Sequence, residues 1–216
     1  MRFEFYRCVL DYIVKNNLAG SYFEFGTHRA RTFTMVMSLD AFYASNHVST
    51  GGALTLKSGG GFMDKYFAFD SFEGWPSLKN GAEDPQFAAD GAKTGSDEFL
   101  YFLTSYGQST ERVKLIRGFY EKFLTKNLAT RFLNENVKAS LITVDCNFYK
   151  SYKSVSSWVD RFMQPGTVLY LDDFNGERAL PTQGSKLAFN KYKEQANWNF
   201  EPFHPIGWCG YSFIVC

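Results

Sequence analysis

The chain has 216 residues, a length that suits one domain with a substantial buried core. Its formal net charge is +1, and the lack of long basic runs argues against nucleic acid as a partner. No stretch approaches the roughly 20 apolar residues that span a bilayer, so we expect no membrane partner either. The aromatic share of 19% predicts an interior packed with large rings.

Two further features indicate a reducing compartment. The opening stretch MRFEFYRCVL interrupts its apolar residues with charges, which is not the pattern of a secretory signal peptide. The cysteines form no C-x-x-C pair, so we expect thiols rather than disulfides or a zinc site: Cys8, Cys146, Cys209 and Cys216. We therefore expect a soluble cytoplasmic protein, and the sequence leaves both a monomer and a homo-oligomer open.

The first part of the chain alternates helices with strands. The N-terminal segment 1–19 carries apolar residues at helical spacing over 3–18, and Gly20 ends this helix. A strand, a helix and a strand are then predicted over 21–26, 29–44 and 65–70. Two segments rich in glycine and small or polar residues have no periodicity, and we expect loop excursions there: 45–62 and 74–97.

The rest of the chain continues this alternation. The predicted order is helix 96–106, strand 112–118, helix 120–136 in one or two pieces, strand 139–146, helix 149–163, strand 167–173, helix 183–196, and strands 198–203 and 207–216. No helix separates the last two strands, which predicts an antiparallel hairpin at one edge of a sheet.

This order of elements predicts an α/β fold in a single domain, residues 1–216. The middle strands are uniformly apolar, which is typical of a mostly parallel sheet covered by helices on both faces. Such a doubly wound, Rossmann-like sheet binds ligands outside the carboxyl ends of its strands. The residues at these ends are therefore the candidates for a functional site: Glu24–Gly26, Asp70–Glu73, Gly118, Asp145 and Asp172–Asp173.

Carboxylates gather at two of these strand ends. Asp145 closes one strand and Asp172 and Asp173 close the next, so the three meet if the strands are neighbours. Negative charges held close are costly, and a hard divalent cation such as Mg²⁺ takes oxygen ligands. The alternative is turn chemistry, in which aspartate accepts backbone N–H bonds. Alternation along a strand separates Asp172 from Asp173, so a shared ion requires a bend, which Gly176 makes easier.

The first strand end is suited to a ligand that approaches the backbone. Gly26 precedes a helix, and a glycine there admits a ligand close to the helix N-terminus. The stretch EFGTHRAR has a single glycine and fails the G-x-G-x-x-G pattern of dinucleotide sites. Asp70 ends the second strand, where an acid commonly holds ribose hydroxyls. His28 is either a proton carrier or a surface or capping residue.

Five stretches carry motifs in a characteristic order: FEFGTHRARTF, FAFDSFEGWP, VKLIRGFYEKFL, ITVDCNFYKSYKSV and PGTVLYLDDFNGER. From about residue 20 to about residue 195 they resemble the class I S-adenosylmethionine-dependent methyltransferases, and within them the macrocin O-methyltransferase family. The resemblance implies a seven-stranded sheet whose last strand is antiparallel. It also implies S-adenosyl-L-methionine and Mg²⁺, or a similar divalent cation, as cofactors. The substrates in that family are hydroxyls, commonly on sugars of glycosylated natural products.

The resemblance also implies roles for single residues. It places Glu24, Gly26 and Thr27 near the methionine part of the cofactor, Asp70, Ser71 and Glu73 near the ribose and adenosine, and Gly118 and Phe119 near the adenine. The family's magnesium ligands match Asp145, Asp172 and Asp173. The family often has D-x-D where this chain has Asp145-Cys146-Asn147, which lowers the local negative charge.

We therefore expect O-methylation of a small-molecule hydroxyl, with Asp145 as the general base beside a bound metal. Two alternatives remain open. One is a metal-dependent glycosyltransferase that uses Asp172 and Asp173, and the other is a non-catalytic protein with a methyltransferase-like fold. Binding of S-adenosylhomocysteine separates the first prediction from both alternatives.

Overall fold

The computed structural model describes residues 1–46, 54–58, 60–76 and 93–216. Parts of both predicted excursions, 45–62 and 74–97, lie outside these ranges. At their described ends the excursions are shorter than predicted, because helix α2 (Arg31–Asn46) continues into the first and helix α3 (Ser96–Ser105) begins within the second.

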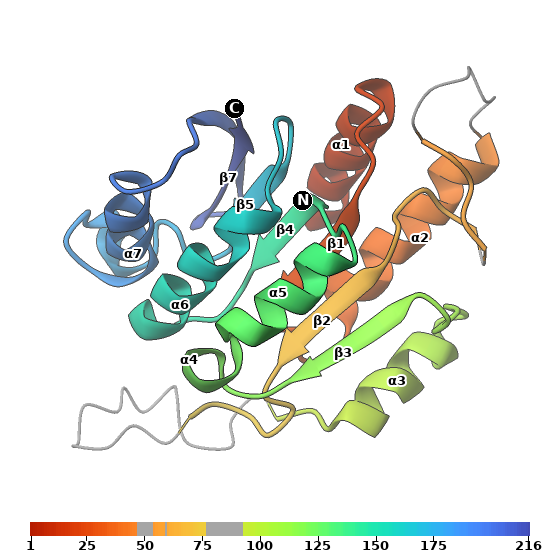
Figure 1. The fold of residues 1–216 in the computed structure, drawn as a ribbon, viewed down its shortest axis with the longest axis horizontal. Helices are drawn as coiled ribbons and strands as arrows, with labels where there is room; N and C mark the ends of the chain where they lie inside the picture. The colour runs from red at the N-terminus through yellow and green to blue at the C-terminus, as the bar shows by residue number, and fades with distance from the viewer. Residues whose placement is uncertain (47–53, 59, 77–92) are drawn as a thin grey trace.

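Seven strands form one sheet in the order β3-β2-β1-β4-β5-β7-β6 (Figure 1). Strands β1 to β5 pair in parallel, and β7 lies antiparallel between β5 and β6. This arrangement confirms the predicted α/β fold with its closing hairpin. The bounds are β1 (Ser21–Phe25), β2 (Tyr66–Asp70), β3 (Val113–Arg117), β4 (Ala139–Val144), β5 (Val168–Leu171), β6 (Phe200–Ile206) and β7 (Gly210–Val215).

Residue type explains which strands are central and which lie at the edges. Strands β1, β4 and β5 are buried along their whole length, as apolar strands between two helix layers must be. The edge strand β6 contains Pro202 and Pro205, and its pairing with β7 is irregular between them. The opposite edge strand, β3, exposes the charged residues Lys114 and Arg117.

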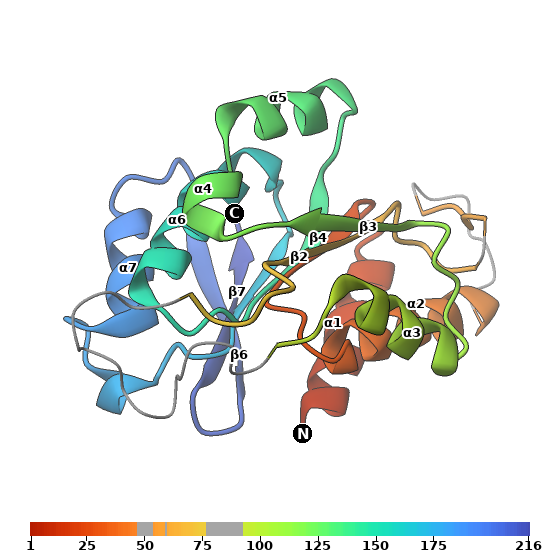
Figure 2. The ribbon, with the colours of Figure 1, turned by 90° about the horizontal axis from the view of Figure 1, so that it is seen from below.

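Helices cover both faces of this sheet (Figure 2). One face packs against α1 (Arg2–Lys15), α2 and α3, and the other against α4 (Tyr120–Phe123), α5 (Lys126–Asn134), α6 (Tyr149–Val159) and α7 (Gly184–Lys193). The predicted helix over 120–136 is thus two helices, and the Thr125 hydroxyl caps the second by accepting from the Leu128 amide at 3.2 Å. Short 3₁₀ turns cover Asp160–Phe162 and Glu177–Ala179.

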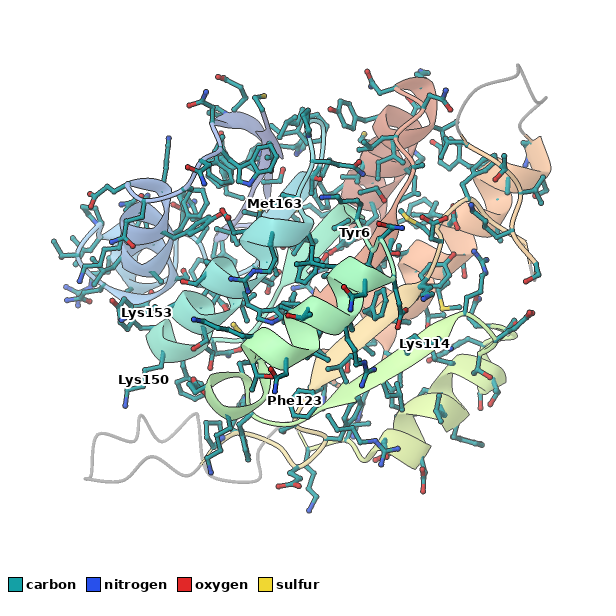
Figure 3. All side chains as sticks on the ribbon, viewed as in Figure 1. Tyr6, Lys114, Phe123, Lys150, Lys153 and Met163 are labelled. Carbon is teal, nitrogen blue, oxygen red and sulfur yellow. The ribbon has the colours of Figure 1, made fainter. Side chains whose placement is uncertain are left out.

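Aromatic side chains fill the space between the sheet and its helices. Trp158 of α6 lies against Phe69, Phe132 and Phe162, with ring centroids 4.6 to 5.5 Å apart. Within the described ranges, every helix is too short or too polar to cross a lipid bilayer. Figure 3 marks the contrast between interior and surface with the buried Tyr6 and Met163 and the exposed Lys114, Lys150 and Lys153.

Strand β5 ends at Leu171, two residues before the predicted end at Asp173. Asp172 and Asp173 lie in the turn that follows, so strand alternation does not separate their side chains. The Gly176 amide donates to the Asp173 carbonyl at 2.9 Å and closes this turn. The bend that a shared metal ion would require is therefore part of the fold.

Candidate active site

The candidate site lies where the strand order of the sheet reverses. Strands β2 and β3 lie on one side of β1, and β4 and β5 lie on the other, so the ends of β1 and β4 face the crevice that such sheets use for ligands. Gly26 follows β1 with a φ of +89°. A Cβ at this position would overlap the backbone oxygen of Asp145 and lie 2.9 Å from its carbonyl carbon. Only glycine lets these two strand ends approach so closely.

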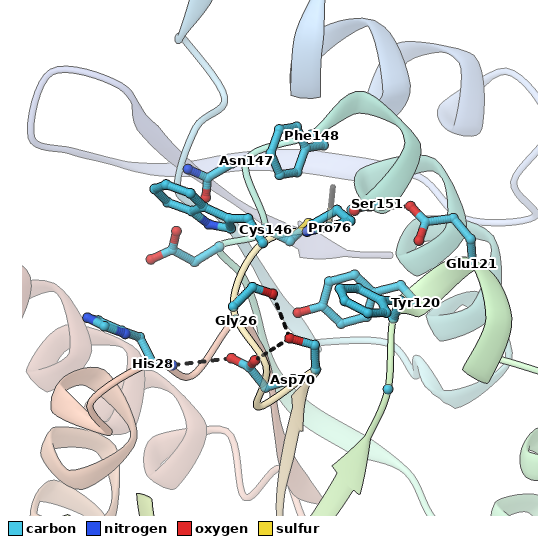
Figure 4. A pocket seen from close by; sticks show the side chains of 16 residues that line it. Gly26, His28, Asp70, Pro76, Tyr120, Glu121, Cys146, Asn147, Phe148 and Ser151 are labelled. Atoms are coloured by element: carbon cyan, nitrogen blue, oxygen red, sulfur yellow. Dashed lines mark hydrogen bonds between the residues drawn. The ribbon is translucent and has the colours of Figure 1, made fainter. Parts of the chain in front are cut away.

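A cavity of about 270 Å³ opens beside these strand ends (Figure 4). His28 lies at one side of it, and Tyr120 and Glu121 lie at the opposite side. Trp75 and Phe148 also line the cavity. Flat aromatic faces stack on planar rings, so this lining suits a ligand with a ring such as a nucleobase.

Asp70 joins the loop after β1 to the loop after β2. Its Oδ2 accepts hydrogen bonds from the Thr27 amide at 2.8 Å and the His28 amide at 3.3 Å, and its Oδ1 accepts from the Phe72 amide at 2.9 Å. A carboxylate offers about four acceptor positions. The Thr27 and Ser71 hydroxyls make longer contacts with the same carboxylate, at 3.4 and 3.5 Å. Because Asp70 also lines the cavity, a ligand hydroxyl could replace one of these longer contacts while the amide bonds hold both loops.

Three carboxylates form a cluster, which we call the triad: Asp145, Asp172 and Asp173. Among the described residues, this is the group whose potential ligand atoms all lie within 4.8 Å of one another. Asp145 follows β4 and also lines the cavity, whereas Asp172 and Asp173 follow β5 and do not line it. The triad and the cavity therefore meet at Asp145.

Hydrogen bonds fix two members of the triad. Asp173 Oδ2 accepts from the backbone N–H of Asn147 at 3.2 Å and from the Tyr152 hydroxyl at 3.1 Å, and this hydroxyl shares its proton with the Val144 carbonyl at 2.9 Å. Asp172 Oδ1 accepts from the Tyr170 hydroxyl. These donors hold the carboxylates in one geometry before any ligand binds.

A cation from the N-terminal helix lies against the triad. Arg2 Nη2 lies 2.5 Å from Asp172 Oδ1 and 3.7 Å from Asp145 Oδ2. Arg2 Nη1 also makes a long hydrogen bond of 3.4 Å to the Thr32 hydroxyl. The guanidinium therefore offsets part of the negative charge that these strand ends concentrate.

Burial and mutual repulsion raise the pKa values of two triad carboxyls. Burial raises the pKa of Asp145 well above its usual range, the charges of Asp172 and Asp173 add to the shift, and Arg2 opposes it. Burial and the charge of Asp172 raise the pKa of Asp173 to about 6, against the hydrogen bonds from Tyr152 and Asn147. Without a cation at the triad, these carboxyls therefore hold their protons more tightly than an ordinary aspartate does, and a bound cation would oppose the shift.

Glu24 lies within β1 and is only 2% exposed. Its Oε2 accepts a hydrogen bond from the Tyr22 hydroxyl at 2.5 Å. Burial raises the pKa of Glu24 well above its usual range, and this hydrogen bond offsets only part of the shift. Glu24 is not part of the cavity lining, so a change at this position should alter the stability of the fold.

The variant Glu24→Gln is expected to be more stable than the wild type at pH 8, by about 1 kcal/mol or more. The pKa of Glu24 in the folded protein is raised above the unfolded value of about 4.3. Protonated Glu24 therefore contributes its full stability below about pH 4.3, and this contribution is lost as the pH rises through the folded-state pKa. Urea unfolding at pH 5 and pH 8 measures this, and the gain should be larger at pH 8. An equal gain at both pH values contradicts the prediction, and Glu201→Gln at an exposed position is the matched control.

The structure divides the predicted cofactor residues into two groups. The cavity lining contains Gly26, Asp70, Ser71, Gly118 and Phe119. Three others lie outside it: Glu24 and Thr27, which are buried, and Glu73, which is exposed. Thr27 still acts on the site through its bond to Asp70, and Glu73 lines a separate depression with Arg117.

Sequence reasoning missed two kinds of residue at this site. Trp75, Tyr120 and Phe148 lie three to five residues beyond strand ends, so the signal for them is their place in the loop that follows each strand. No local signal identifies Arg2. Its contact with Asp172 joins residues that are 170 positions apart in the chain, and it depends on how α1 packs against the sheet.

No protein-family model matches the chain, and no curated protein sequence matches it. Solved structures do match. The chain is similar to the O-methyltransferase NovP, with a TM-score of 0.71 and 14% identity over 99% of this chain and 78% of NovP. It is similar to CalS11, a calicheamicin methyltransferase, with a TM-score of 0.70 and 16% identity over 98% of this chain and 77% of CalS11.

A third similar structure is an O-methyltransferase from Bacillus cereus in complex with S-adenosylhomocysteine (SAH). Its TM-score is 0.56 and its identity 12%, over 99% of this chain and 79% of that protein. Identities this low establish architecture. The chain therefore has the Rossmann-like fold of these O-methyltransferases.

Proposed function

We propose that the protein is a class I S-adenosylmethionine-dependent O-methyltransferase. Its acceptor is a hydroxyl of a small molecule, on a sugar of a glycosylated metabolite, and Mg²⁺ or a similar divalent cation is its second cofactor. The observation that carries the proposal is the double position of Asp145, which lines the cavity and belongs to the triad. Methyl donor and acceptor must meet within reach of one base, and the two sites join at this residue.

The cavity suits S-adenosylmethionine in its chemistry. Trp75, Tyr120 and Phe148 offer aromatic faces to an adenine, and the Asp70 carboxylate can accept from ribose hydroxyls. Gly26, which has no side chain, also lines the cavity at the end of β1. The Bacillus cereus enzyme of the same fold was solved with SAH, which supports this use of the fold.

The triad suits a hard divalent cation. Its ligand atoms are carboxylate oxygens within 4.8 Å of one another, and Mg²⁺ prefers such oxygens. The triad already pairs with one positive charge, the Arg2 guanidinium, which lies against Asp172 and Asp145. A divalent cation held by Asp145, Asp172 and Asp173 would orient the acceptor oxygens and lower the pKa of the reacting hydroxyl.

Within this chain, Asp145 accepts the proton that the acceptor hydroxyl loses when its oxygen attacks the methyl group. Tyr152 and the Asn147 amide keep Asp173 in place, and Tyr170 does the same for Asp172. Methyl transfer from a sulfonium needs mainly an in-line approach, so this positioning supplies much of the catalysis. CalS11 is a TDP-rhamnose 3'-O-methyltransferase of the same fold, which supports a sugar hydroxyl as the acceptor.

Ligand binding provides the first test. Thermal-shift titration with SAH should raise the Tm of the protein, whereas UDP-sugars should leave it unchanged. A Tm increase with UDP-sugars and none with SAH would favour a glycosyltransferase, and no increase with either would favour a non-catalytic protein. Release of SAH in the presence of sugar acceptors then tests catalysis directly.

The variant Asp172→Asn is expected to lose about 100-fold or more of its metal-dependent methyl transfer while it binds SAH nearly as the wild type does. Asn keeps one oxygen for the Arg2 and Tyr170 hydrogen bonds but removes the charge that a cation needs. Turnover with and without EDTA and the Kd for SAH are the measurements. Asp11→Asn, at a half-buried position of α1 that pairs with Lys15 away from the triad, is the control. Turnover that survives both EDTA and the Asp172 change would refute the metal mechanism.

A further inference from the structure

We propose that Arg2 is a built-in counter-ion of the triad that competes with a divalent cation, so that this one side chain sets the metal affinity of the site. The inference rests on the proposed function, because it assumes that the triad binds a metal. It adds a regulatory element that lies outside the triad and outside the cavity lining.

The competition follows from the hydrogen bonds at one oxygen atom. Asp172 Oδ1 accepts from Arg2 Nη2 at 2.5 Å and from the Tyr170 hydroxyl. A carboxylate oxygen has two lone pairs, so both acceptor positions of Oδ1 are already used. A metal ion can bind this atom only if one of the two donors leaves.

The surroundings decide which donor can leave. Tyr170 is 1% exposed, and its ring packs against Phe5 and Tyr6 at centroid distances of 5.0 and 6.1 Å. The Arg2 side chain is 43% exposed, and among the described residues its one further hydrogen bond is the contact of 3.4 Å with Thr32. Arg2 is therefore the donor that swings out, and the buried Phe5 and Tyr6 keep α1 in place while it does so.

Charge repulsion also weakens metal binding if the metal ion binds carboxylate oxygens of the triad other than Asp172 Oδ1. Arg2 Nη2 lies 3.7 Å from Asp145 Oδ2, so a cation bound between Asp145 and Asp172 would be close to the guanidinium. Two cations at such a distance repel each other. By either route, Arg2 weakens metal binding.

Isothermal titration of the full chain with Mn²⁺ tests this at one fixed pH. Arg2→Gln should lower the Kd for Mn²⁺ roughly tenfold, which is about 1.4 kcal/mol of binding free energy. Arg2→Lys, which keeps the positive charge, should remain within about twofold of the wild type. Arg7→Gln is the matched control: it removes one positive charge from the same helix, but Arg7 pairs with the exposed Glu4 instead of the triad.

A thermal-shift series with the same four proteins gives a readout independent of turnover. Without metal, Arg2→Gln should have a lower Tm than Arg7→Gln, because the triad has lost its counter-ion. Saturating Mn²⁺ should raise the Tm of Arg2→Gln more than that of the wild type. SAH binding, measured in parallel, shows whether each variant is folded.

The outcomes separate the inference from the function on which it rests. Equal Kd values for the wild type and Arg2→Gln overturn the role of Arg2 and leave the metal site standing. An equal gain for Arg2→Gln and Arg7→Gln also overturns it, because the effect would then be one of net charge. If no variant binds Mn²⁺ while all bind SAH, the metal part of the proposed function fails and this inference fails with it.

Discussion

The variant Asp145→Asn is expected to lower kcat for methyl transfer by about 10²- to 10⁴-fold, the range that a general base contributes. The amide cannot take the acceptor's proton, and it removes one negative charge from the triad. The backbone of residue 145 keeps its hydrogen bond to the Phe25 carbonyl at 2.8 Å and its contact with Gly26. The cavity should therefore keep its shape, and the Kd for SAH should change by no more than a few fold.

Steady-state release of SAH and isothermal titration with SAH measure the two quantities separately. Asp11→Asn again provides a change from Asp to Asn away from the triad, and it should leave both unaffected. An Asp145→Asn enzyme with kcat within about fivefold of the wild type would show that another group takes the proton. The base assignment would then be wrong, although the cofactor site would stand.

The variant Gly26→Ala is expected to lose several kcal/mol of unfolding free energy, and its affinity for SAH should fall at least about tenfold. A methyl group at this position overlaps the Asp145 carbonyl, and the φ of +89° is one that alanine rarely adopts. The first loop must move to relieve the overlap. That movement breaks the hydrogen bond of 2.8 Å from the Thr27 amide to Asp70.

Urea unfolding and SAH titration check both effects. Gly95→Ala is the matched control, because Gly95 has a φ of −66° and a Cβ there meets nothing within 4 Å. Gly95→Ala should lower the free energy of unfolding by about 1 kcal/mol or less. Equal losses for the two alanine variants would show that the contact between the ends of β1 and β4 does not limit the site.

The fold could be predicted because each signal for it is local. Apolar strands such as 139–146, bounded by helices with their own periodicity, predict a covered parallel sheet without knowledge of any contact. Helix and strand limits were less accurate, since end residues depend on the turn that follows. The strand predicted over 167–173 stops at Leu171, because the chain turns at Asp172.

The candidate site could be predicted only where the sheet itself brings residues together. Asp145 and Asp172 follow adjacent parallel strands, so the strand order alone makes them neighbours. Glu24 is different: its place within β1 directs its side chain to Tyr22 instead of the cavity. Arg2 reaches the triad only through the docking of α1, and no pattern in its own segment encodes that contact.

The two edge strands have a consequence for assembly. In β6, Pro202 and Pro205 lack the N–H groups that a further strand would need, and in β3 the exposed Lys114 and Arg117 place charge on the other free edge. Neither edge is a template on which a second copy could continue the sheet. A dimer of this chain would therefore have to be built from helix and loop surfaces, with each sheet ending within its own subunit.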